Sequence, residues 1–180
     1  MRFLAVLCVV ACIQLVAENI VGYLYGNNYF LVDYYTVVEM SLLAAVFFFS
    51  AKSNVRRLAV AVLFFSFIAY WVIDMLQKPD PQLINTKLAM VSRVFLIAMS
   101  LVGFQNVLAG EASAISRAPV FWVSFAVALY SAGTLVVFGL SNELLKMGFV
   151  YFSAAWYINW TLVIVVNLMY SKGMLCREPA

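Results

Sequence analysis

Residues 58–76 consist of LAVAVLFFSFIAYWVIDML, an apolar run whose one charged side chain, Asp74, lies near its end. An α-helix rises about 1.5 Å per residue, so a helix of this length crosses the hydrocarbon core of a bilayer, which is about 30 Å thick. Such a run with a single charge is typical of a membrane span. We therefore interpret residues 58–76 as a transmembrane helix.

Similar apolar runs lie on both sides of this one. They cover residues 3–22, 31–50, 88–109, 119–140 and 149–170. The separators are short and contain helix-breaking or charged residues, including Ser141-Asn142-Glu143 between the last two runs. Short connections favour antiparallel neighbours. The sequence therefore predicts an all-α fold, a polytopic membrane protein in which residues 1–180 form one domain, a six-transmembrane-helix bundle with short loops.

The composition supports this class and excludes several functions. Hydrophobic residues make up 66% of the chain and charged residues 11%, whereas soluble domains contain roughly half and a quarter. Six spans occupy about two thirds of the chain, which leaves no room for a soluble catalytic or nucleic-acid-binding domain. The chain has no histidine, which excludes His-ligated haem, zinc or copper and a Ser-His-Asp triad. We expect no cofactor, no metal and no nucleic acid, and the lipid bilayer as the surroundings.

The apolar part of the first run, from Phe3 to Ala17, is too short for a span, so the helix must include Glu18 and Asn19 to cross the bilayer. A signal peptide is the alternative, since Val9-Val10-Ala11-Cys12 matches a lipoprotein cleavage pattern. Too few residues lie between Arg2 and this pattern for the apolar part of a cleaved signal, so we favour a retained helix. More Lys and Arg residues lie on the side of both termini, which predicts cytoplasmic termini in a bacterial inner membrane or its equivalent.

Ionisable residues within the spans share one layer. They are Glu18, Asp33, Glu39, Asp74 and Arg93. Because successive helices alternate in direction, all five belong to the outer half of the bundle. Glu39 lies about 12 Å below Leu31, and Arg93 about 8 Å below Leu88, whereas the other three are within reach of the lipid headgroups. A lone charge at mid-helix costs about 2.5 to 3.5 kcal/mol on insertion scales, so we expect Glu39 and Arg93 to form an ion pair.

This ion pair has two interpretations. It either lines a ligand site, or it clamps two helices together without any ligand. Substitution of Glu39 by Gln distinguishes the two: a ligand site loses binding while folding is retained, whereas a clamp loses folded yield.

Aromatic side chains gather in the same layer, where most are explained by the aromatic belt of a membrane protein. Helical spacing places some of them beside the charges and gives a candidate ligand site, which consists of Glu39, Arg93, Asp74, Tyr35, Tyr70, Trp156 and Trp160. Ser153 and Asn167 extend the tryptophan stripe on the last helix. Aromatic walls and carboxylates attract cationic groups, and Arg93 binds an anionic group. We therefore expect a small zwitterionic or heteroaromatic ligand.

The predicted function is that of a ligand-binding, sensory or accessory subunit that acts through a partner membrane protein. An intramembrane enzyme that uses paired carboxylates and a structural subunit of a larger complex are the alternatives. In length and number of helices, the chain resembles the substrate-capture subunits of energy-coupling factor vitamin transporters. That resemblance implies a ligand near the outer surface and dependence on partners for energy, although Cys8 and Cys12 stand where that family has an Ala-x-x-x-Ala contact.

Overall fold

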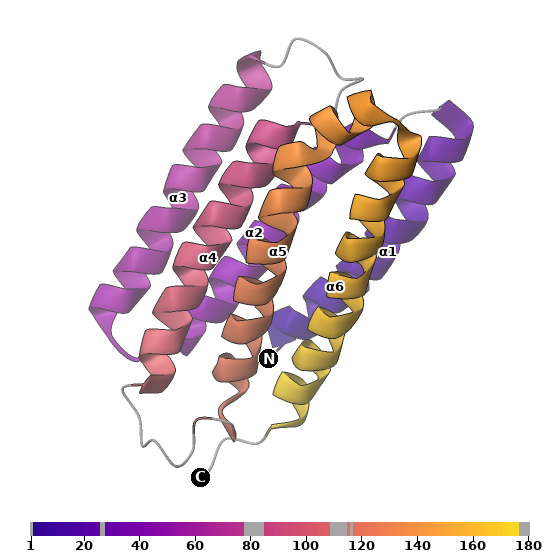
Figure 1. Ribbon diagram of the computed structural model, residues 1–180. Coiled ribbons are helices and arrows are strands. Elements are labelled where there is room, and N and C mark those ends of the chain that lie inside the picture. Colours follow the sequence, from indigo (N-terminus) through magenta and orange to yellow (C-terminus); the bar gives the residue numbers. More distant parts are fainter. Residues whose placement is uncertain (1, 26–27, 78–84, 109–114, 116, 177–180) are drawn as a thin grey trace.

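A computed structural model describes residues 2–25, 28–77, 85–108, 115 and 117–176. The helices in this part of the chain are α1 (Arg2–Tyr25), α2 (Tyr29–Ser50), α3 (Asn54–Gln77), α4 (Thr86–Leu108), α5 (Pro119–Met147) and α6 (Phe149–Leu175) (Figure 1). Each of the six is long and apolar enough to cross a membrane. The predicted all-α six-helix bundle is confirmed, and the protein is an integral membrane protein whose helices contact lipid.

The predicted separator at 141–143 is wrong, because these residues continue α5 as far as Met147. A serine is tolerated there because the hydroxyl of Ser141 donates a hydrogen bond of 2.6 Å to the backbone oxygen of Val137, one turn earlier. The helix ends at Gly148, whose φ of 129° lies in the region that only glycine adopts readily. The turn between the last two helices therefore depends on the backbone conformation of Gly148 rather than on the polar residues 141–143.

Other helix ends also extend beyond the apolar runs. Helix α3 begins at Asn54 rather than at residue 58, because the hydroxyl of Ser53 accepts a hydrogen bond of 3.3 Å from the backbone N–H of Arg56 and caps the first turn. Helix α6 continues to Leu175 rather than ending at residue 170. Residue 109, the predicted end of the fourth run, lies outside the described residues.

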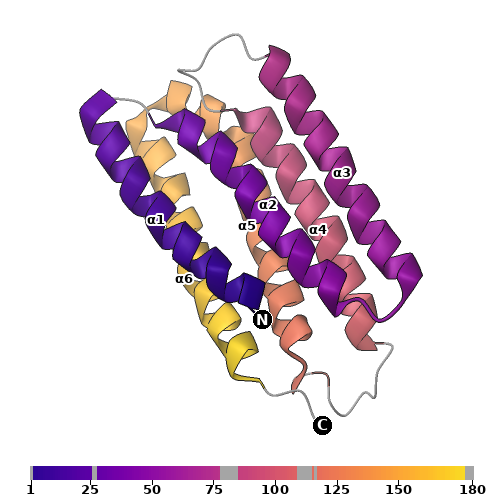
Figure 2. The same ribbon diagram turned by 180° about the vertical axis from the view of Figure 1, so that it is seen from behind.

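The helices pack in an order that leaves two of them at the edges. Helix α4 contacts α2, α3 and α5, whereas the extensive contacts of α1 are with α2 and those of α6 are with α5. Helix α1 begins and α6 ends towards the same end of the bundle (Figure 1 and Figure 2). We call the opposite end, where α1, α3 and α5 end and α2, α4 and α6 begin, the distal end.

Most of the largest fully buried side chains come from α2, α4 and α5. The largest fully buried side chains include Phe47, Phe67, Met40, Leu43, Leu96, Met99, Val123 and Val127. Close approach of these helices depends on Gly103 in α4, since a Cβ atom there would overlap the side chain of Ser124 and come within 2.8 Å of the Phe47 ring. Small residues allow membrane helices to approach closely in this way.

Candidate functional site

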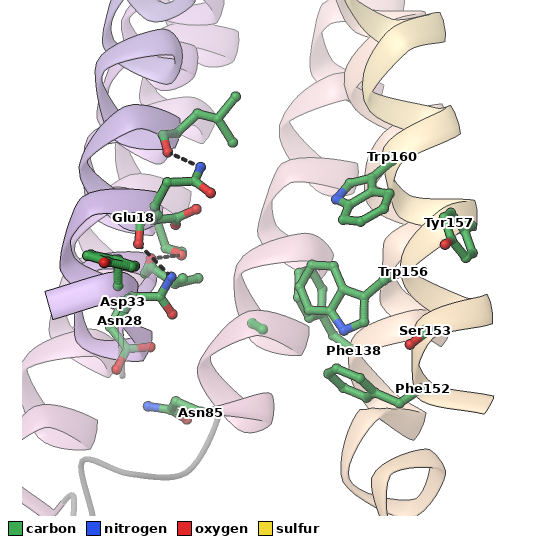
Figure 3. A pocket seen from close by; sticks show the side chains of 17 residues that line it. Glu18, Asn28, Asp33, Asn85, Phe138, Phe152, Ser153, Trp156, Tyr157 and Trp160 are labelled. Carbon is green, nitrogen blue, oxygen red and sulfur yellow. Dashed lines mark hydrogen bonds between the residues drawn. The ribbon is translucent and has the colours of Figure 1, made fainter. Parts of the chain in front are cut away.

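A cavity of about 700 Å³ lies in the distal half of the bundle. Helices α1 and α2 form one wall, α5 and α6 form the opposite wall, and the beginning of α4 contributes to the lining (Figure 3). Its lining residues are Leu15, Glu18, Asn19, Gly22, Tyr23, Asn28, Val32, Asp33, Thr36, Asn85, Ala89, Phe138, Phe152, Ser153, Trp156, Tyr157 and Trp160. The volume is within the range of small-molecule sites, which is about 300 to 1,000 Å³.

The wall formed by α1 and α2 carries two carboxylates, Glu18 and Asp33 (Figure 3). Glu18 is held in place by Gln14, whose side-chain amide donates a hydrogen bond of 2.8 Å to the carboxylate. Asp33 is only 5% exposed. The side chain of Asn28 donates a hydrogen bond of 3.0 Å to the backbone oxygen of Glu18 and ties the beginning of α2 to the end of α1. Glu18 is thus positioned by its own helix and by Asn28, and Asp33 is buried on the neighbouring helix.

The wall formed by α5 and α6 is aromatic. Trp156 lies edge-on between Phe138 and Phe152, with ring centroids 6.0 and 5.8 Å apart, and Trp160 packs against Tyr157 at 5.3 Å. Such edge-to-face contacts hold the rings in fixed positions. The indole N–H of Trp156 is buried and has no hydrogen-bond partner among the described residues. This wall therefore offers aromatic faces together with one unused hydrogen-bond donor.

The charged side chains among the described residues that line the cavity are both acidic. Glu18 and Asp33 line the cavity, and no Lys or Arg is among the described residues that do so. A cation between these carboxylates and the indole rings would be attracted from both sides, and the low dielectric of the membrane interior strengthens both attractions. The cavity therefore has the chemistry of a site for an organic cation with an aromatic or apolar body.

The predicted ion pair between Glu39 and Arg93 is confirmed. A guanidinium nitrogen of Arg93 lies 3.0 Å from Glu39 Oε2, and both side chains are buried. The guanidinium also lies over the rings of Tyr130 and Phe138, 4.8 and 5.6 Å from their centroids. Neither charged residue lines the larger cavity, although Phe138 does. The pair joins α2 to α4 behind the aromatic wall, so Arg93 is not placed to bind an anionic group of a ligand in that cavity.

A second, smaller cavity of about 90 Å³ lies beside this pair. Glu39 and Tyr35 line it together with Tyr130, Tyr170 and Asn167. The spacing of Tyr35 and Glu39 correctly placed them on one helix face. The structure therefore divides the predicted site: Trp156 and Trp160 line the larger cavity, and Tyr35 and Glu39 line the smaller one.

The two remaining predicted site residues, Asp74 and Tyr70, belong to α3 and line neither of these cavities. The carboxylate of Asp74 accepts a hydrogen bond from the side-chain amide of Asn85. The oxygen of the same Asn85 amide accepts a hydrogen bond of 3.1 Å from the backbone N–H of Leu88 and caps α4. Tyr70 packs at the edge of the hydrophobic core. Asp74 therefore links the end of α3 to the beginning of α4.

Asn85 is thus expected to stabilise the fold through two separate hydrogen bonds. We expect Asn85→Ala to lower the free energy of unfolding by about 1 kcal/mol, the usual effect of losing a helix cap. Asn85→Ser retains a capping hydroxyl and loses the amide donor to Asp74, so it should have a smaller effect. Unfolding by SDS titration in mixed micelles measures both variants. Equal stability of Asn85→Ala and the wild type would contradict the role of the cap.

Reasoning from the sequence missed Glu18 and Asp33 as cavity residues, because their depth placed them near the lipid headgroups. The informative signal was their position in the distal half of adjacent helices, together with Thr36 one turn after Asp33. Of the predicted stripe on α6, Ser153, Trp156 and Trp160 line the larger cavity, whereas Asn167 lines the smaller one.

Comparison of the chain with protein-family models, curated proteins and solved structures finds no match. The function therefore has to be inferred from the chemistry of the cavities.

Proposed function

We propose that the protein is a membrane receptor or binding subunit that holds a small organic cation in the larger cavity. The observation that carries this proposal is the arrangement of its walls: Glu18 and Asp33 lie on one side, and the indole ring of Trp156 lies on the other. Carboxylates and aromatic faces are the groups that recognise ammonium ions, and aromatic walls also hold an apolar ring. The ligand differs from the expected zwitterion, because Arg93 is occupied by Glu39.

Orientation and partner complete the proposal. The excess of Lys and Arg on the side of the termini favours an outward-facing distal end, so the ligand is taken from the outer side of the membrane. Since the connections between helices are short, a response to the ligand passes to a partner membrane protein. Native mass spectrometry after gentle extraction detects such a partner as a co-purifying chain. Consistent extraction of the chain alone would contradict this part of the proposal.

Binding of 2-phenylethylamine to the protein in lipid nanodiscs tests the ligand chemistry. A hydrogen bond to a charged group contributes about 1.5 to 3 kcal/mol, so we expect Asp33→Asn to weaken binding by about tenfold to a hundredfold. Trp156→Ala should also weaken binding, because the aromatic face is lost. The neutral analogue 2-phenylethanol should bind more weakly than the amine. Isothermal titration calorimetry measures each affinity.

The matched control is Glu143→Gln, which neutralises an exposed carboxylate in α5 that does not line the cavity. We expect this variant to bind the amine as the wild type does. Equal binding of the amine by Asp33→Asn and wild type, together with equal binding of the amine and the alcohol, would show that the site does not select cations. Absence of binding by both probes would contradict the proposed site.

A structural subunit is the second candidate, favoured by the position of the Glu39–Arg93 pair behind the aromatic wall. For that function, the carboxylates of the cavity would be dispensable. Assembly with a partner that persists when both Glu18 and Asp33 are replaced by their amides would support it.

A further inference from the structure

The two edge helices of the bundle bound the larger cavity. Both α1 and α6 contribute to its lining, yet α1 and α6 share no extensive contact among the described residues. Each is attached to the bundle through one neighbour, α2 and α5 respectively. Figure 1 and Figure 2 show α6 on one face of the bundle and α1 on the opposite face, and away from the distal end both helices line the smaller cavity. The cavity is therefore bounded along this side by two helices that do not close over it.

The rim of the cavity lies at the lateral surface of the protein. Leu15 on α1 and Trp160 on α6 line the cavity, although 62% and 57% of their surfaces are exposed. Both lie within membrane-spanning helices. At about 1.5 Å per residue, Leu15 is about 10 Å from residue 22, where the apolar run of α1 ends, so the rim reaches about a third of the way into a hydrocarbon core of about 30 Å. At that depth the surroundings are acyl chains rather than water.

Polar and apolar parts of the cavity are arranged like the two ends of an amphiphile. Its carboxylates come from Glu18 and from the buried Asp33, whereas the rim at Leu15 and Trp160 is apolar and open to lipid. A molecule dissolved in the bilayer would place an ammonium group at the carboxylates and leave a hydrocarbon chain between the two edge helices.

We infer that the ligand is an amphiphilic amine that reaches the cavity from the bilayer, through the opening between α1 and α6. Its ammonium group lies at Glu18 and Asp33, and its hydrocarbon chain extends past Leu15 and Trp160 into the lipid. This inference rests on the proposed function and adds to it the class of ligand and the route of entry.

The dependence of affinity on chain length tests the inference. Primary alkylamines from butylamine to dodecylamine are equilibrated with the protein in nanodiscs, and the free aqueous amine is measured by mass spectrometry after dialysis, with empty nanodiscs subtracted. Burial of each methylene contributes about 0.8 kcal/mol, so the aqueous Kd should fall about fourfold per added methylene through the whole series. A closed cavity would stop gaining affinity once it is full, and a plateau or reversal would overturn the inference.

Two tryptophan substitutions on the same helix provide the matched pair. Leu15→Trp obstructs the rim, whereas Ile13→Trp changes a residue that is equally exposed, at 63%, and lines neither of the two cavities. We expect Leu15→Trp to weaken dodecylamine binding at least tenfold while 2-phenylethylamine binding is retained, and Ile13→Trp to change neither. Equal effects of the two substitutions on dodecylamine would overturn the position of the bound hydrocarbon chain at this rim, and with it the opening to the bilayer.

The failure of this inference differs from the failure of the proposed function. If 2-phenylethylamine binds and its affinity depends on Asp33, but long-chain amines gain nothing, the cation site stands and the lateral route is wrong. If no amine of any length binds, the cation site itself is wrong, and the inference falls with it.

Discussion

Glu39→Gln is expected to lower the free energy of unfolding by about 3 to 5 kcal/mol, the usual effect of removing one partner from a buried ion pair. The substitution retains the shape of the side chain but leaves the guanidinium of Arg93 without its counter-charge in a site that is 5% exposed. The rings of Tyr130 and Phe138 still lie under the guanidinium, and they offset only part of the loss, since a cation–π contact contributes about 2 kcal/mol when desolvated.

Arg93→Met should destabilise the protein less than Glu39→Gln does. A carboxyl group left alone in an apolar site can take up a proton and become neutral, whereas a guanidinium group cannot lose one. Combination of the two substitutions removes both charges and should restore most of the lost stability. SDS titration in mixed micelles, followed by circular dichroism, completes this double-mutant cycle.

The matched control again uses Glu143, whose pair with Lys146 has an N–O distance of 2.8 Å but is exposed. An exposed pair contributes about 0 to 1 kcal/mol, so Glu143→Gln should change stability little. If Glu39→Gln were no worse than Glu143→Gln, the buried pair would not clamp α2 to α4. Since the pair lies behind the aromatic wall, we also expect folded Glu39→Gln protein to bind 2-phenylethylamine. Loss of binding without loss of stability would show that the pair belongs to the ligand site.

The ion pair could be predicted from the sequence because membrane physics leaves few alternatives for Glu39 and Arg93. Two opposite charges at similar depths in a bilayer pair with each other, whatever the exact rotation of their helices. The class of fold was predictable for a related reason, since each apolar run has to cross the hydrocarbon core as a helix.

The cavity was not predictable in the same way. In a soluble protein, the apolar stripe of a helix indicates its buried face, but helices in a bilayer are apolar on every side. Whether Asp33 points towards lipid headgroups or into the bundle depends on how α2 is rotated against α1 and α4, and the apolar pattern does not record that rotation. Asp74 was assigned to the ligand site, but its carboxylate accepts a hydrogen bond from Asn85, the residue that caps the next helix. The apolar pattern gives no sign of that contact.

Helix ends were predicted less well than spans. The apolar run ends where the hydrocarbon ends, but a helix continues into the headgroup region while its backbone groups remain paired. Ser141 satisfies its hydroxyl within α5, and only the positive φ of Gly148 stops that helix. A change in polarity therefore marks the edge of the membrane better than it marks the end of a helix.

Gly103→Val is expected to destabilise the protein by about 3 kcal/mol, the upper part of the range for overpacking a close-packed interior. Even a single Cβ atom at this position would overlap the side chain of Ser124 and lie 2.8 Å from the ring of Phe47. The Ser124 hydroxyl can rotate away, but Phe47 is fully buried and has no room to move. Relief therefore requires α4 to move away from α2 and α5, which would loosen the buried core between these helices.

Gly139 in α5 provides the control for this substitution. A Cβ atom there would lie 3.5 Å from the flexible end of Met90, an ordinary contact, and replacement of a helical glycine by alanine favours the helix by about 1 kcal/mol. Gly139→Ala should therefore be neutral or stabilising, while Gly103→Ala should be destabilising despite the same gain in helix propensity. SDS titration of both variants measures the difference directly. If Gly103→Ala were as stable as Gly139→Ala, the close approach of α4 to α2 and α5 would not depend on glycine.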